Sequence, residues 1–190
     1  MKNANKPPLS PEQMALQKTM REEEWRRRRD ELRIAQKPII DDLSRIGVGV
    51  DSVWDLSIEY NDYDIAIGIL LKHITLYYPD VIKEGIARAL SVPAARPSFG
   101  FLVKLFESTN LSDQPRFKEG LASAIAKLAS DVEIDKIVEL ITDNRHGDVR
   151  LHLLLPLMRS RLDRAHDLLE RLSSDPTFAK EIKARRRPRK

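Results

Sequence analysis

A short stretch that occurs twice constrains the fold of this chain more than any other feature. Residues 83–87 read Lys-Glu-Gly-Ile-Ala and residues 118–122 read Lys-Glu-Gly-Leu-Ala, with Pro79 nearly in register with Pro115. A weaker third copy lies in residues 146–160. Recurrence at roughly 30 to 45 residues is typical of stacked helical pairs, because one pair cannot bury its own apolar face. The repeat therefore predicts an array of helical pairs.

A second pattern precedes each copy and predicts the first helix of each pair. Segments with the shared order apolar, apolar, charged, variable, apolar begin at Leu70, Leu102, Ile137 and Leu168. Each forms one apolar stripe on a helix. The three copies predict the second helices, and residues 176–186 predict a last helix that closes the stack. Residues suited to cap the first helices are Asp64, Ser98, Asp131 and Asp163.

The predicted fold class is all-α. Only 7 of the 190 residues are glycine, and period-two alternation of apolar residues is rare, which argues against a β architecture. We predict an α-solenoid of three to four antiparallel helix pairs over residues 38–182. Residues 1–37 are expected to form a flexible leader and a charged Arg- and Glu-rich helix, and residues 183–190 a basic tail.

The start of the third copy carries a family resemblance. Asp148, Val149 and Arg150 open a second helix in an order that resembles HEAT repeats, whose second helices tend to begin with Asp and then Val-Arg. The similarity covers about residues 62–180, and residues 78–90 look like a stretch of small bacterial HEAT-repeat proteins of unassigned function. The resemblance implies HEAT-like pairs and a bacterial origin. Such repeats specify architecture strongly and activity weakly.

Gly85 and Gly120 depart from the HEAT pattern and occupy equivalent positions within predicted helices. A mid-helix glycine costs roughly 0.5 to 1 kcal/mol relative to alanine, so a repeated one needs a reason. We interpret both as positions where a neighbouring helix approaches closely, and approach of a ligand to the backbone is the alternative. In the third copy, His152 and Pro156 also depart from the pattern and predict a kinked pair.

The best candidate for a partner-binding face is a basic ladder. One position in three successive second helices is basic, and its residues are Lys83, Lys118 and Arg150. Stacking would align them along one side of the solenoid, with Glu84 and Glu119 beside them on the candidate face. The structural alternative is pairing between repeats, with the two glutamates as partners or, as the HEAT resemblance implies, with Asp80 and Asp148.

A capping motif predicts the start of a helix that runs to about Lys37. Ser10 is the expected N-cap, Pro11 the first helical residue, and Gln13 closes a capping box. Residues 22–24 are all Glu, and each stands four residues before an arginine, which favours i,i+4 pairing. Such a helix can form without a core, so a solvated, self-paired helix is the first interpretation.

Trp25 stands out on this polar helix, because an indole usually packs against its own protein or against a second chain. We therefore count Trp25 among the candidate partner-binding residues, and a dimer through this helix is a further hypothesis. The candidate nucleic-acid-binding residues are Arg26, Arg27, Arg28 and Arg29 in this helix and Arg185, Arg186, Arg187 and Arg189 in the tail. An anionic membrane surface or simple solubilisation are the alternatives for the tail.

Composition excludes several classes of function. The chain has no cysteine, which excludes disulfides, thiol catalysis and zinc-thiolate sites. No apolar run reaches the roughly 20 residues that a membrane span requires, and the N-terminus lacks a signal-peptide pattern, so we expect a cytoplasmic protein. His146, Asp148 and His152 are the one cluster of ligand-type residues, and a further ligand on the same helix face is lacking. No metal and no cofactor are predicted.

The sequence therefore predicts a non-enzymatic scaffold or adaptor that binds an unidentified protein partner through one face of the solenoid. The alternative from another class is a nucleic-acid-binding protein that uses the tail, the ladder and the Arg-rich helix. A HEAT-like DNA glycosylase is the least favoured alternative. It needs aromatic residues and a catalytic carboxylate on a basic concave surface, whereas Trp25 and Trp54 lie outside the repeats. No catalytic residue is assigned.

Overall fold

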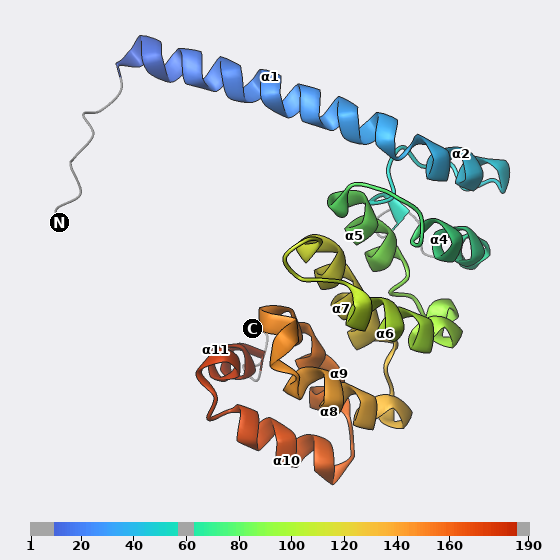
Figure 1. Cartoon of the computed structure of the whole chain (residues 1–190), viewed down its shortest axis with the longest axis vertical. Helices are drawn as coiled ribbons and strands as arrows, with labels where there is room; N and C mark the ends of the chain where they lie inside the picture. Colours follow the sequence, from blue (N-terminus) through green and yellow to red (C-terminus); the bar gives the residue numbers. More distant parts are fainter. Residues whose placement is uncertain (1–9, 57–62, 186–190) are drawn as a thin grey trace.

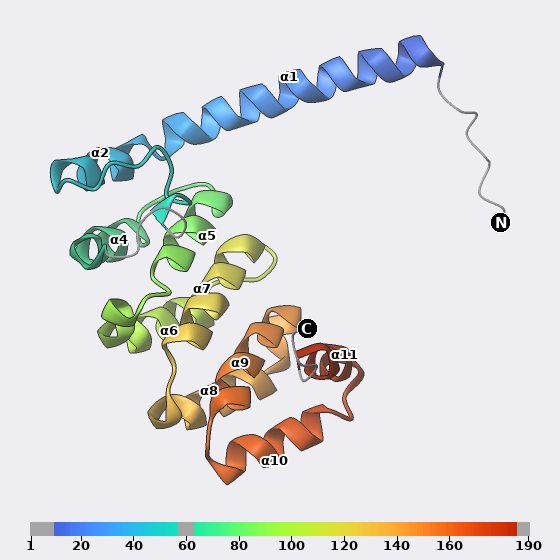
Figure 2. The same cartoon turned by 180° about the vertical axis from the view of Figure 1, so that it is seen from behind.

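The computed structural model describes residues 10–56 and 63–185, and this part of the chain is all-helical, without a strand. Figures 1 and 2 show one long helix that projects from a body of shorter helices. The leader predicted before Ser10 lies outside the described residues, as do Arg186, Arg187 and Arg189 of the predicted tail.

The projecting helix is α1 (Pro11–Ala35), and the predicted capping box starts it. The Ser10 hydroxyl accepts the backbone N–H of Gln13 at 3.2 Å, and the Gln13 side chain accepts the N–H of Ser10 at 3.0 Å. α1 ends slightly earlier than predicted, and α2 (Lys37–Arg45) follows. Gly47 has a φ of 85° just after α2, as expected of a glycine that ends a helix.

The body alternates first and second helices in the predicted order (Figure 1). The first helices are α4 (Ile67–His73), α6 (Phe99–Ser108), α8 (Ile134–Thr142) and α10 (Asp163–Leu172). The second helices are α5 (Asp80–Ala89), α7 (Pro115–Leu128), η4 (Asn144–Leu153) continued by α9 (Leu154–Arg159), and α11 (Pro176–Arg185). Short 3-10 helices lead into α4, α6 and α8, and they are η1 (Asp64–Ala66), η2 (Pro93–Ser98) and η3 (Asp131–Glu133). The predicted helical segments are therefore confirmed.

Second helices contact one another in order along the body. α5 lies along α7, α7 contacts η4 and α9, and α11 contacts η4. The first helix of each pair also contacts its own second helix, as α6 does α7 and α8 does η4. A continuous apolar core lies between these helices, and Phe106, Phe117 and Phe178 are its largest fully buried side chains. The core thus extends from α2 to α11.

Gly85 and Gly120 lie where two elements approach closely. A Cβ atom on Gly120 would stand 2.9 Å from the carbonyl oxygen of Glu84, so α7 lies directly against the α5 backbone. A Cβ atom on Gly85 would stand 2.6 Å from Val53 Cγ2 and 3.1 Å from the Trp54 indole. The packing interpretation is therefore confirmed for Gly120, whereas Gly85 packs against the turn at residues 53–55 rather than against a helix.

The third pair is kinked, as its sequence predicts. η4 is a 3-10 helix, and Gly147 within it has φ 57° and ψ −146°, which breaks the helix there. Pro156 in α9 has no N–H to bond the carbonyl of His152, so α-helical bonding is lost just before it. The main break lies at Gly147, ahead of the two residues that predicted the kink.

The predicted N-caps of the first helices are wrong. α4, α6, α8 and α10 have no N-cap hydrogen bond from a side chain, which excludes that role for Asp64, Ser98, Asp131 and Asp163. A 3-10 helix leads into three of these helices, and carbonyl oxygens of η1 and η2 accept the N–H groups of Ile67 in α4 and Phe99 in α6. A capping box does occur one element earlier, where Ser130 and Glu133 cap η3.

Candidate functional site

Lys118, the middle residue of the basic ladder, is buried. It is 3% exposed, and its Nζ donates to the carbonyl oxygen of Thr109 at 2.6 Å. The same Nζ lies 4.9 Å from the centroid of the Phe106 ring. Thr109 is the C-cap of α6, so the ammonium group meets the negative end of that helix dipole. Burial lowers the pKa of Lys118. Its charge stabilises its own helix pair.

Arg150 repeats this arrangement in the next pair. It is 8% exposed, and its guanidinium donates to the carbonyl oxygens of Ile141 at 3.1 Å and Gly147 at 2.8 Å. The Asn144 side chain accepts a third hydrogen bond at 2.8 Å, and the Phe178 ring centroid lies 5.1 Å away. Ile141 is in the last turn of α8. In both pairs, the ladder position therefore fixes the C-terminal end of the first helix.

The predicted basic ladder is therefore wrong as an exposed binding face. Lys118 and Arg150 point into the body because their long side chains reach the end of the preceding helix. Lys83 is half-buried, and its Nζ lies 4.3 Å from the centroid of the Phe117 ring on α7. Burial lowers the pKa of Lys83 as well. The charges of Lys118 and Arg150 are structural, but they bind backbone carbonyl oxygens of their own helix pair rather than the carboxylates that the alternative interpretation named.

Asp80 has a different role from the predicted pairing with the ladder. Its carboxylate accepts the backbone N–H groups of Arg116 at 3.0 Å and Phe117 at 2.8 Å. α7 begins at Pro115, so a residue of α5 caps the N-terminus of α7. The two second helices are thus joined by a cap at one end and by the Gly120 contact further along.

The two glutamates of the candidate face belong to an ion-pair network across the second helices. Glu84 is buried and lies 2.9 Å from Arg88 and 3.7 Å from Arg116. Glu119 lies 3.1 Å from Arg88 and 3.5 Å from His152. Burial lowers the pKa of His152. The network joins α5, α7 and η4, and its carboxylates are occupied by partners within the protein.

Sequence reasoning missed a polar cluster that joins α2, α4 and the turn before α5. His73 Nδ1 lies 2.7 Å from the Tyr78 hydroxyl, and His73 Nε2 lies 2.9 Å from an Asp42 oxygen. Hydrogen bonds from His73 and Lys72 lower the pKa of Asp42 to about 2. His73 is 2% exposed, so this Tyr-His-Asp arrangement is closed to a substrate and clamps helices together. No motif spacing links Asp42 to His73.

The ligand-type residues around η4 do not converge. His146 is buried, with its ring centroid 4.5 Å from that of Phe106 and its Nε2 3.6 Å from Asp143. Burial lowers the pKa of His146. His152 lies beside Glu119 instead. Within residues 10–56 and 63–185, no group of three or more His, Asp or Glu side chains is placed to hold a metal ion.

Helix α1 is exposed along its whole length, in contrast to the helices of the body. None of its 25 residues is buried, and Trp25 is 74% exposed. Packing of Trp25 against the protein's own body is therefore excluded. The four candidate arginines of this helix, residues 26–29, are exposed as well. In the described part of the tail, Arg185 pairs with Glu181 at 2.7 Å.

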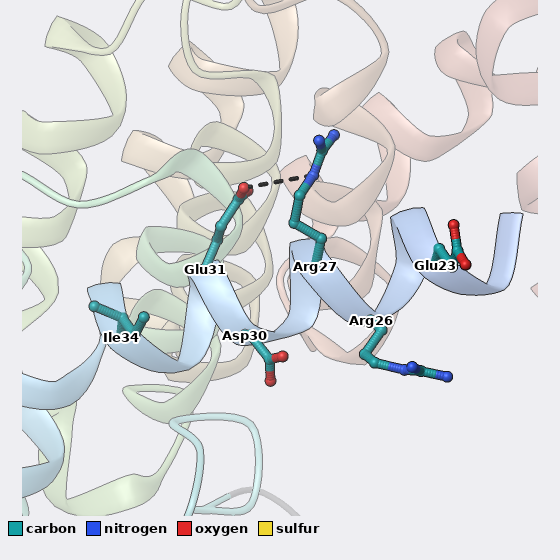
Figure 3. A pocket seen from close by; sticks show the side chains of 6 residues that line it. All are labelled: Glu23, Arg26, Arg27, Asp30, Glu31 and Ile34. Atoms are coloured by element: carbon teal, nitrogen blue, oxygen red, sulfur yellow. Dashed lines mark ion pairs between the residues drawn. The ribbon is translucent and has the colours of Figure 1, made fainter. Parts of the chain in front are cut away.

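Two shallow depressions lie along α1, and side chains of α1 alone line them. Figure 3 shows the one that is lined by Glu23, Arg26, Arg27, Asp30, Glu31 and Ile34. Its dashed line marks the ion pair between Arg27 and Glu31 at 3.7 Å. A depression with walls from one helix cannot exclude water from a substrate. Neither depression is therefore suited to enclose a substrate.

Trp25 lies among cations on one side of α1, which we call the Trp25 face. At 3.6 residues per turn, this side also holds four exposed cations, Lys18, Arg21, Arg28 and Arg29. Glu22 lies at the edge of the face and pairs with Lys18 at 3.9 Å. In this pair and in the Arg27 pair the cation precedes the acid, the reverse of the predicted order.

None of the helices in the described ranges is both long enough and apolar enough to cross a membrane. Comparison of the chain with protein families, curated proteins and solved structures gives no match. The HEAT resemblance therefore rests on the sequence pattern, and the candidate site rests on the exposure and chemistry of α1.

Proposed function

We propose that this chain is a non-enzymatic adaptor in which a HEAT-like α-solenoid carries a partner-binding helix. In this proposal, the helices from α4 to α11 form the solenoid, and α1 binds a protein partner through the Trp25 face. Ordered contacts between successive second helices support the solenoid. The burial of Lys118 and Arg150 supports a binding site on α1, because buried cations do not meet a partner.

The exposure of Trp25 is the observation that carries the proposal. Burial of a large apolar side chain contributes about 1.5 to 3 kcal/mol, and this indole, which is 74% exposed, obtains only a small part of that from its own chain. Tryptophan and arginine are also the residues most enriched at the energetic centres of protein interfaces. The Trp25 face combines one tryptophan with three arginines and one lysine, all exposed.

The charges of the Trp25 face define the chemistry of the partner. Its centre has no carboxylate, and Glu22 lies at the edge. Guanidinium groups bind carboxylates in a bidentate geometry, and clustered cations accelerate association with an acidic surface. The partner that fits is therefore a protein with an apolar pocket for the indole and acidic residues around it.

Capture of partners from the source cell tests this proposal with the full-length chain. The double variant Trp25→Ala and Arg28→Glu removes the anchor and reverses one charge, and neither residue is buried, so folding is expected to be unchanged. Tyr77→Ala is the matched control, because Tyr77 is an aromatic residue of the body that is 99% exposed. We expect the control to keep a partner that the double variant loses. A partner that both variants keep, or that only the control loses, contradicts the proposal.

Nucleic-acid binding is the second candidate, because cations around an exposed indole also suit phosphates and stacked bases. The acids at residues 22–24, 30 and 31 of the same helix lower its attraction for a polyanion and favour the protein partner. A titration with single-stranded RNA and DNA at about 50 mM salt separates the two. Binding that weakens steeply with salt and is lost in the double variant supports nucleic acid. The adaptor proposal predicts no binding.

A further inference from the structure

The side of α1 that faces away from Trp25 has the spacing of a coiled-coil seam. Its residues are four and three positions apart in alternation, and they are Leu16, Met20, Glu23, Arg27, Asp30 and Ile34. We call this set the seam. The apolar members Leu16, Met20 and Ile34 are all exposed, because the described part of the body does not cover them. One depression on α1 follows this side of the helix, and the other lies at its edge and includes Met20, Glu23 and Arg27 of the seam.

We propose that α1 pairs through the seam with α1 of a second copy of this chain, in antiparallel orientation. Centred on the level of residue 25, this pairing places Leu16 against Ile34 of the second copy and Met20 against Asp30 of the second copy. It also places Glu23 against Arg27 of the second copy. Two-fold symmetry repeats each contact, so apolar layers close both ends and Glu-Arg layers occupy the centre.

Charge selects the antiparallel orientation. A parallel pair would bring Glu23 against Glu23, Arg27 against Arg27 and Asp30 against Asp30 of the second copy. Like charges at a seam are strongly unfavourable. In the antiparallel pair, Glu23 instead lies against Arg27 of the second copy, and these charges are complementary. The Trp25 face cannot form the same kind of pair. Antiparallel contact there, centred on the same level, sets Arg21 against Arg29 of the second copy, so that face stays available for an acidic partner.

The shape of α1 agrees with a second helix at the seam. One depression includes Met20 and the other Ile34, and both include Glu23 and Arg27. Figure 3 shows that Arg27 and Glu31 rise on the same side of the helix between these positions. Side chains of a facing helix insert into such gaps in a coiled coil. Figures 1 and 2 show α1 projecting from the body, so the two bodies lie at opposite ends of the pair.

The proposed pairing is weak and dependent on concentration. Near its centre, Glu24 and Arg26 flank the seam, and each lies beside the same residue of the second copy. These like charges are exposed and oppose the Glu-Arg layers in part. The monomer and the pair therefore exchange, and salt changes the balance between them. The inference does not require the proposed partner of the Trp25 face.

Sedimentation of the full-length chain over a wide concentration range tests the pairing by exchange of charges. Glu23→Arg alone and Arg27→Glu alone each place like charges in both central layers. We expect each single variant to associate at least about tenfold more weakly than the wild type. The double variant restores the complementary layers and is expected to associate like the wild type. An equimolar mixture of the two single variants is also expected to associate, because each supplies the charge that the other needs.

Each outcome decides the inference. Circular dichroism first establishes that the helix content of all variants is equal. A wild type that is monomeric at every concentration overturns the pairing, and so do single variants that associate as well as the wild type. In both cases, the capture experiment with Trp25→Ala and Arg28→Glu still tests the adaptor proposal independently. Loss of the captured partner without self-association leaves the Trp25 face as the one binding surface of α1.

Discussion

Helices α1 and α7 show two different ways in which this sequence makes a helix. Nine of the 14 residues of α7 are buried, and the helix lies directly against α5 through Gly120. None of the 25 residues of α1 is buried. Its helix depends on the capping box at Ser10, on residues of high helix propensity and on local ion pairs. α7 stabilises the fold, whereas α1 is available to bind.

The comparison also shows that basic residues have different roles in this chain, some structural and some exposed to solvent. Lys118 in α7 ends at a backbone carbonyl inside the body, while Arg28 in α1 ends in solvent. Both were candidate binding residues from the sequence. The decisive difference is what lies within reach of the side chain, because the C-terminus of α6 lies beside Lys118, whereas no other element of the described ranges lies beside Arg28.

Replacement of an aromatic residue by alanine is expected to give the largest difference in stability between the two helices. Phe117→Ala in α7 removes a buried ring, and we expect a loss of about 3 to 5 kcal/mol in the free energy of unfolding. Trp25→Ala in α1 is expected to change that free energy by less than about 0.5 kcal/mol. Urea unfolding followed by circular dichroism measures both. A similar loss in the two variants would show that α1 packs against the body.

Substitution of Gly120 tests the close approach that distinguishes α7. A Cβ atom there meets the backbone of α5, so Gly120→Ala is expected to destabilise the fold by about 1 to 3 kcal/mol. Gly100→Ala in α6 is the matched control, because a Cβ atom at Gly100 meets nothing within 4 Å. We expect this control to stabilise the fold by about 0.5 to 1 kcal/mol. Stabilisation by both substitutions would refute the close contact.

Removal of a lysine distinguishes the structural cation from an exposed one in the same helix. Lys118→Ala deletes the hydrogen bond to Thr109 and the contact with Phe106, with an expected loss of about 1 to 2 kcal/mol in the free energy of unfolding. Lys127→Ala in the same helix is the control, since Lys127 is exposed. Equal stability of the two variants in chemical denaturation would return Lys118 to the list of binding residues.

The pH dependence of stability gives a smaller effect that belongs to the body. Burial and the nearby Lys118 and Arg145 lower the pKa of His146, while Asp143 and Glu107 oppose this. The unfolded chain therefore binds a proton near pH 6.5 more readily than the folded chain does. Stability is expected to fall as the pH drops through about 6.5, by less than about 1 kcal/mol from this residue.

His146→Phe tests this pH effect, because it keeps an aromatic ring beside Phe106 and removes the titration. The decrease in stability between about pH 7.5 and about pH 5.5 should become smaller in the variant. Part of the decrease remains, since burial lowers the pKa of His152 as well. An identical pH profile in the wild type and the variant would exclude His146 as a source.

The sequence allowed the helices and their order to be predicted, because an apolar stripe and a recurring glycine are local signals with one packing solution. A kink in the third pair was predictable from Pro156, whereas its main break at Gly147 was not. The direction of Lys118 was not, because it depends on the position of the α6 C-terminus in space. The Asp42, His73 and Tyr78 cluster was equally inaccessible, since its residues come from separate elements.

Site-directed cross-linking of α1 tests most directly the claim that this helix is a binding element. The chain has no native cysteine, so Leu16→Cys and Ile34→Cys each carry one exposed thiol. The account predicts a disulfide-linked dimer when the two variants are mixed under oxidising conditions, and little cross-linking in either variant alone. Cross-linking of Leu16→Cys with itself at the same rate as in the mixture, or no cross-linking in the mixture, would contradict the antiparallel pairing.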